Sequence, residues 1–169
     1  MIMISCLVII IIILAFFQSS HDRGVVAVIY AGVCGVHSLL FYEFDNGYCL
    51  IELPPKYYYL SAAVCDLAII TTIALVTSFL IKPTRLADNL MDICLISIAL
   101  NAFGLVLMWK GLSLEPYSLS YGALYLIAII ALLREDCANG YKSSKRNSRI
   151  RLAVRGCVQY CRQVQEEKT

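Results

Sequence analysis

Long runs of apolar residues fill most of the first 133 positions of the chain, and short polar stretches separate them. The runs cover residues 2–17, 24–42, 57–81, 89–109 and 116–133. A bilayer core about 30 Å thick needs about 20 helical residues, and about 17 to 25 are tolerated. The three middle runs fit this range, and the first and last lie near its lower limit. The pattern therefore predicts an all-α, polytopic bundle of about five transmembrane helices.

The composition agrees with a membrane protein. Hydrophobic residues make up 60% of the 169-residue chain and charged residues 15%, whereas soluble domains average about 45–50% and about 25%. The runs are continuously apolar, so they do not show the alternation of a transmembrane β-strand. A helix also satisfies its own backbone amides, as a lipid environment requires. We expect one transmembrane domain over residues 1–133 and a tail over residues 134–169.

The first run has a second interpretation, as a cleaved secretory signal peptide. Such a peptide begins with basic residues and ends in a small-residue pattern of the Ala-x-Ala type. Residues 1–5 contain no Lys or Arg, and residues 16–20 contain no such pattern. The sequence therefore favours an uncleaved first helix, with the signal peptide as the alternative.

The distribution of basic residues predicts the topology. With five crossings and the tail in the cytoplasm, only Lys56 and Lys110 lie outside, and the other 12 of the 14 Lys and Arg residues lie inside. Cytoplasmic loops carry such an excess in membrane proteins. We predict a multi-pass protein of a bacterial inner membrane or its equivalent, with the N-terminus outside. Tyr117, Tyr121 and Tyr125 recur at every fourth position, which favours packing and interface anchoring.

Three polar side chains interrupt the apolar runs at a similar depth. With a rise of about 1.5 Å per residue, His37 lies about 6 Å, Asp66 about 4–5 Å and Asn101 about 3 Å to the outer side of the membrane centre. Polar groups inside a bilayer are costly and commonly meet one another between helices. We predict a shared intramembrane cluster of His37, Asp66 and Asn101 between the second, third and fourth helices. Asp92 lies near the inner interface instead, where it can reach headgroup water or pair with Arg85.

The cluster has three interpretations. In the first, Asp66 and His37 form a satisfied pair, and Asn101 fixes the register of the helices. In the second they form a proton or ion relay, because a His–Asp pair can change its charge near neutral pH. The third is a metal site that adds Cys34 and Cys65, but Cys65 and Asp66 are adjacent and point about 100° apart on a helix. We therefore predict neither a metal nor a cofactor.

The tail combines basic residues with an apolar seam. The basic residues of interest are Lys145, Arg146, Arg149, Arg151, Arg155 and Arg162. The apolar positions, at spacings of four and three, are Ile150, Val154, Cys157, Cys161 and Val164. This spacing predicts a cytoplasmic amphipathic helix over residues 148–165.

A basic amphipathic helix beside a membrane usually lies on the anionic inner leaflet. A short coiled coil with a second copy or a partner is the alternative. Nucleic-acid binding would rest on charge alone and is not favoured. Cys137, Cys157 and Cys161 are weak candidates for palmitoylation in a eukaryotic host.

The sequence contains no H-E-x-x-H, G-x-S-x-G or P-loop motif, so we do not expect an enzyme. We expect a membrane scaffold or accessory subunit whose basic tail binds the inner membrane surface or a partner. It would work as a homo-oligomer or with another membrane protein. The alternative is an oligomeric channel, transporter subunit or phage lysis-type pore that uses His37, Asp66 and Asn101. The layout resembles that of many small phage and bacterial membrane proteins, and no closer family resemblance is evident.

Overall fold

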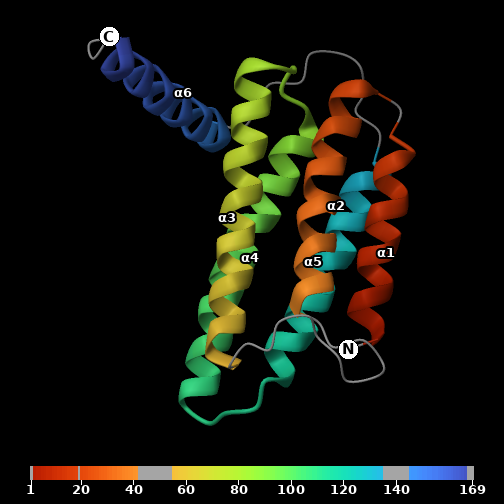
Figure 1. Cartoon of the computed structure of the whole chain (residues 1–169). Helices are drawn as coiled ribbons and strands as arrows, with labels where there is room; N and C mark the ends of the chain where they lie inside the picture. Colours follow the sequence, from red (N-terminus) through yellow and green to blue (C-terminus); the bar gives the residue numbers. More distant parts are fainter. Residues whose placement is uncertain (1, 19, 42–54, 135–144, 167–169) are drawn as a thin grey trace.

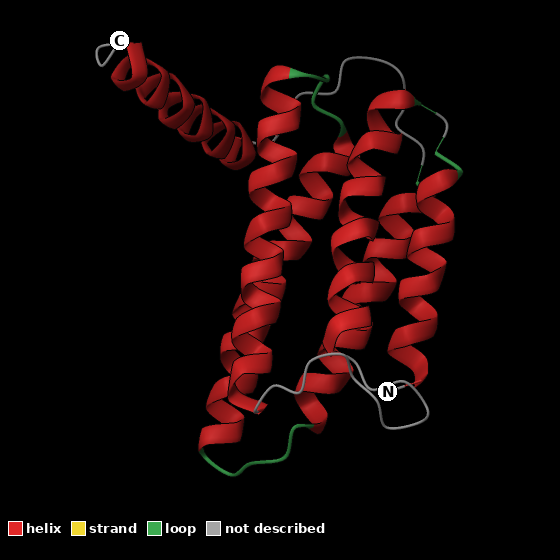
Figure 2. Cartoon of the chain, viewed as in Figure 1, coloured by secondary structure: helices red, strands yellow, loops and turns green. Residues whose placement is uncertain are grey.

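The computed structural model describes residues 2–18, 20–41, 55–134 and 145–166, and the side chains of residues 2–8 and of several helix-end residues lie outside this description. Within the described part every regular element is a helix (Figure 2). The six helices are α1 (Ile2–Phe16), α2 (His21–Phe41), α3 (Pro55–Phe79), α4 (Arg85–Trp109), α5 (Glu115–Leu133) and α6 (Lys145–Glu166). The predicted all-helical fold is therefore confirmed. Most residues between the second and third predicted spans and the start of the predicted tail lie outside the described residues.

Three of the helices are long and apolar enough to cross a membrane. They are α3 over Tyr57–Phe79, α4 over Arg85–Trp109 and α5 over Glu115–Leu133. Helix α1 has 15 residues, so at 1.5 Å per residue it is about 22 Å long, which is shorter than a bilayer core. Helix α2 has 21 residues and reaches about 31 Å, but it opens on three polar residues.

Helices α1 to α5 run side by side, and the chain reverses direction between them at alternate ends of the bundle (Figure 1). Each of α1 to α4 packs on the next helix, α1 packs on α5, and α2 also meets α4. The second, third and fourth helices therefore pack together, as the sequence pattern predicted. Small buried residues such as Ala27, Ala31 and Cys94 allow this close approach. Large apolar side chains such as Ile73 and Leu90 fill the centre.

Helix α4 turns its small and polar face inward, because Cys94, Ser97, Asn101 and Gly104 are all buried. A Cβ atom at Gly104 would lie only 2.5 Å from Tyr59 Cε1 and 2.7 Å from Cδ2 of the tyrosine at position 117. Glycine is thus needed where these two rings cross the helix.

We call the end of the bundle that holds the α1–α2 and α3–α4 turns the tail end. Helix α4 starts there with an N-cap, since Thr84 Oγ1 accepts a hydrogen bond of 3.1 Å from the Ala87 amide. Helix α6 packs on α3 at this end and then points away from the bundle (Figure 1). Its first half contacts the bundle, whereas Cys157, Val158 and Tyr160 in its second half are exposed.

Candidate functional site

Two of the three residues of the predicted polar cluster, Asp66 and Asn101, lie in contact inside the bundle. The Asn101 Nδ2 amide donates to Asp66 Oδ2 at 3.3 Å. The Tyr117 hydroxyl of α5 donates to Asn101 Oδ1 at 2.9 Å. Asp66 is 9% and Asn101 1% exposed. We call this group of three residues the polar layer; it joins α3, α4 and α5.

A second hydrogen bond extends the polar layer toward the tail end. Ser97 Oγ donates to the Tyr121 hydroxyl at 3.0 Å. A cavity of about 20 Å³ borders Asp66, Ser97 and Tyr30. A cavity of this volume holds about one water molecule. The polar groups thus turn toward one another around a very small space.

His37 lies against a different turn of α3. Its Nε2 atom is 3.4 Å from Ser61 Oγ, and its ring centroid is 5.9 Å from that of Tyr58. Ser61 precedes Asp66 by five residues, which is about 7–8 Å along the helix axis. The structure therefore brings Asp66 and Asn101 into contact and places His37 one to two turns farther from the tail end. The described residues include no group of three His, Cys, Asp or Glu side chains arranged to hold a metal ion.

A row of tyrosine rings runs beside the polar layer. Successive ring centroids are 5.8, 5.1, 5.4 and 5.5 Å apart along Tyr58, Tyr59, Tyr117, Tyr121 and Tyr125. These distances suit tilted and edge-to-face aromatic contacts. Packing was predicted for the three α5 tyrosines, but the roles of the Tyr117 and Tyr121 hydroxyls in the polar network were missed. Their spacing of four residues opposite Asn101 and Ser97, themselves four apart, was the available signal.

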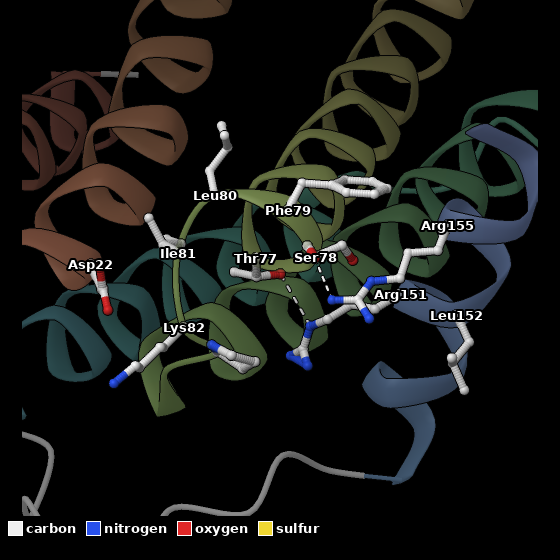
Figure 3. A pocket seen from close by; sticks show the side chains of 11 residues that line it. Asp22, Thr77, Ser78, Phe79, Leu80, Ile81, Lys82, Arg151, Leu152 and Arg155 are labelled. Atoms are coloured by element: carbon white, nitrogen blue, oxygen red, sulfur yellow. Dashed lines mark hydrogen bonds between the residues drawn. The ribbon is translucent and has the colours of Figure 1, made fainter. Parts of the chain in front are cut away.

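A second polar site fastens α6 to the tail end of the bundle. The Arg151 guanidinium forms an ion pair with the Asp88 carboxylate, and its Nε atom donates to Thr77 Oγ1 at 3.1 Å. Arg151 is 6% exposed, Asp88 2% and Thr77 2%. Figure 3 shows Arg151 entering from α6 toward Thr77. A charged pair at this degree of burial requires such complementary partners on both sides.

Asn147 completes this site one turn earlier on α6. The side chain is fully buried, and its Nδ2 amide donates to the Asp88 carbonyl oxygen at 3.2 Å and to Asp92 Oδ1 at 3.1 Å. We call Asn147, Arg151, Thr77, Asp88 and Asp92 the tail clasp. Sequence reasoning singled out Asp92 but missed Asp88 and Asn147.

Arg155 continues the same stripe of α6 one turn later. Its guanidinium donates to the Ser78 carbonyl oxygen and lies 5.8 Å from the centre of the Phe79 ring (Figure 3). Asn147, Arg151 and Arg155 are thus spaced by four residues along one face. This polar stripe lies beside the predicted apolar seam, of which Ile150 and Val154 are packed against the core.

The tail residues predicted to bind a membrane surface or partner fall into three groups. Arg149, Arg155 and Arg162 are exposed, so they remain available for that role. Arg151 is buried in the tail clasp instead. The side chains of Lys145 and Arg146 lie outside the described part of the structure.

Arg23, one of the basic residues predicted to lie on the inner side, is buried at the tail end. Its guanidinium donates to the Leu132 carbonyl oxygen at 3.1 Å and to Gln18 Oε1 at 3.1 Å. Gln18 Nε2 donates to the same Leu132 oxygen at 3.2 Å. The α1–α2 turn therefore caps the last turn of α5, where helix carbonyls have no partner of their own.

The polar layer joins three consecutive helices, α3, α4 and α5, whereas the tail clasp joins α6 to α3 and α4. The polar layer holds one carboxyl group against a neutral amide, and the tail clasp pairs another with a guanidinium. This chemistry suits the fixing of helix positions. Comparisons with known protein families, with curated proteins and with solved structures gave no match, so any function has to be inferred from the geometry of these two sites.

Proposed function

We propose that this chain is a non-enzymatic integral membrane protein that acts as a scaffold or accessory subunit. Its tail helix would bind the inner membrane surface or a partner there. The tail clasp is the observation that carries this proposal. Because the buried ion pair between Arg151 and Asp88 fixes one face of α6 to the bundle, the other face is presented in a defined direction. That face carries Arg149, and Arg162 is exposed farther along α6.

The proposed topology has five crossings, with the N-terminus outside and the tail end at the cytoplasmic surface. Two features support it. The chain reverses at alternate ends through all five bundle helices (Figure 1), and the tail end receives the basic residues Arg23, Lys82 and Arg85 in addition to the tail. Helix α1 would cross only with local thinning of the bilayer or with help from flanking residues, because it is short.

The alternative function, an oligomeric channel or transporter subunit, would depend on the polar layer. Asp66 is buried and hydrogen-bonded to Asn101, and the cavity beside it holds about one water molecule. These observations favour a closed link between helices within one chain. We therefore treat the polar layer as a structural part of the scaffold.

The test compares assembly and localisation of four forms of the protein in mild detergent and in cells. They are the full chain, the chain ended at Leu133, the clasp variant Asn147→Ala/Arg151→Ala and the control Arg134→Ala/Gln159→Ala. The control removes one arginine and one side-chain amide, as the clasp variant does, but from exposed positions at the end of α5 and in α6.

We expect the full chain and the control to share one assembly of higher mass, with itself or with a partner. The shortened chain and the clasp variant should lose it. If both keep the assembly and the localisation of the full chain, the scaffold proposal is wrong. A pH-dependent flux through liposomes that disappears in Asp66→Asn would favour the channel instead.

A further inference from the structure

An open pocket of about 570 Å³ lies between the α3–α4 turn and α6, beside the tail clasp (Figure 3). Two exposed cationic side chains line it, Lys82 from the turn and Arg155 from α6. Exposed apolar side chains line it as well, with Phe79 51%, Leu80 77% and Leu152 64% exposed. The pocket thus combines positive charge with accessible apolar surface.

The charges in the pocket do not cancel. Arg151 also lines it, but its charge is matched by Asp88 in the tail clasp. Among the described residues that line the pocket, the one acidic residue is Asp22 of α2. Figure 3 shows Lys82 and Asp22 on the α2 side, while the arginines enter from α6. Lys82 and Arg155 therefore leave an excess of positive charge for an anionic ligand.

We infer that this pocket binds the headgroup of an anionic phospholipid. Lys82 and Arg155 would hold the phosphate between the α3–α4 turn and α6, as basic pockets at the cytoplasmic side of helix bundles do. The acyl chains would lie against Phe79, Leu80 and Leu152. A free phosphate ion would leave these apolar side chains unused, whereas a lipid covers them. The volume is in the range of small-molecule sites, about 300–1,000 Å³.

This inference rests on the proposed function, since it requires the tail end to lie at the membrane surface. It also adds a consequence. A lipid held by both cations joins the α3–α4 turn to α6, so it stabilises the docked position of the tail by binding that position preferentially.

The experiment measures lipid retention by the full chain in mild detergent, by native mass spectrometry and by the melting temperature. The probes are phosphatidylglycerol and phosphatidylcholine with the same acyl chains, and inorganic phosphate. The pocket variant is Lys82→Gln/Arg155→Gln. The control is Lys110→Gln/Arg134→Gln, which removes the same net charge from exposed positions that do not line the pocket and lie outside α6.

We expect the full chain and the control to retain phosphatidylglycerol in preference to phosphatidylcholine. The pocket variant should bind phosphatidylglycerol roughly 25-fold more weakly, because each lost cation weakens binding about fivefold. Lys82→Gln alone leaves the contact between Arg155 and Ser78 in place and should still weaken binding about fivefold, which covers the case in which the double variant does not fold.

Equal weakening in the pocket variant and the control would overturn the inference in favour of general surface attraction. Displacement of the lipid by inorganic phosphate at similar concentration would overturn it in favour of a simple ion site. Neither result would alter the tail-dependent assembly of the scaffold. Conversely, assembly that survives loss of the tail would refute the scaffold while leaving the lipid preference of the full chain intact.

Discussion

Two buried aspartates show how differently the middle and the tail end of this bundle are held together. Asp66 lies in the polar layer and accepts a hydrogen bond from the neutral Asn101 amide. Asp88 lies in the tail clasp and pairs with the Arg151 guanidinium. Both are at most 9% exposed. The same type of side chain therefore has a neutral partner in one place and a charged partner in the other.

The difference arises from the helices that each site has to join. The apolar faces of α3, α4 and α5 already hold these helices together. A neutral hydrogen bond between them is therefore sufficient to fix their register. Such bonds contribute about 0.6 kcal/mol on average in membrane proteins. Helix α6 has little apolar surface against the bundle, chiefly Ile150 and Val154, so polar contacts have to determine its position. Breaking one side of a buried ion pair costs about 3–5 kcal/mol.

The largest effect is expected from breaking the tail clasp. Arg151→Ala leaves the Asp88 carboxylate buried without its guanidinium, which should weaken the docking of α6 by about 3–5 kcal/mol. Helix α6 should then separate from the bundle while α1 to α5 stay folded. Amide hydrogen exchange in α6 should rise strongly, and limited proteolysis should remove the tail.

Two further variants serve as controls for Arg151→Ala. Arg149→Ala removes an exposed arginine from the same helix and should leave exchange in α6 unchanged. The double variant Asp88→Leu/Arg151→Leu removes both charges, and such exchanges are often close to neutral. If the amides of α6 exchange as slowly in Arg151→Ala as in the native protein, the contrast between the two aspartates has no energetic basis.

The next largest effect is expected where the tyrosine rings cross α4. Gly104→Ala would place a Cβ atom 2.5 Å from Tyr59 Cε1, and such overpacking costs about 1–3 kcal/mol. Gly32→Ala is the matched control, because its Cβ atom would meet nothing within 4 Å. Unfolding in a denaturing detergent should show lower stability for the first variant and equal or higher stability for the second. Equal stability of the two would show that the rings move aside freely.

Much of the bundle could be predicted from the apolar runs, and much of the tail clasp could not. The five bundle helices and the inward faces of α3 and α4 reflect local spacing, because burial against neighbours repeats every three to four residues. The contact between Asp66 and Asn101 was predicted from equal depth. The clasp joins residues 63 positions apart, and the spacing of Asn147, Arg151 and Arg155 is typical of any solvated basic helix. Their burial depends on where α6 docks, which local patterns do not determine.

A smaller effect is expected at Asp66 itself. Asp66→Asn keeps a hydrogen-bonding partner for Asn101 and should change the free energy of unfolding by about 0.6 kcal/mol, and by no more than about 1.7 kcal/mol. Asp66→Leu should cost more, because it leaves the Asn101 amide buried without this acceptor, at about 1–3 kcal/mol. Unfolding titrations of the two variants give the comparison. A loss in Asp66→Asn as large as that in Arg151→Ala would mean that the charge of Asp66 matters and that the polar layer resembles the tail clasp.

The smallest effect is expected from Tyr117→Phe, which removes the hydroxyl group and keeps the ring. The variant loses the hydrogen bond to Asn101 and should cost about 0.6 kcal/mol, the average for such bonds in membrane proteins. Tyr117→Leu also loses the ring contacts with Tyr59 and Tyr121, each of which contributes about 0.5–1.5 kcal/mol beyond its buried area. Unfolding both variants under the same conditions separates the contribution of the hydroxyl to stability from that of the ring. The stability lost with the hydroxyl could exceed the stability lost with the ring. The polar layer, rather than the packing around it, would then be the main determinant of helix position. The middle of the bundle would in that case depend on polar contacts as strongly as the tail end does.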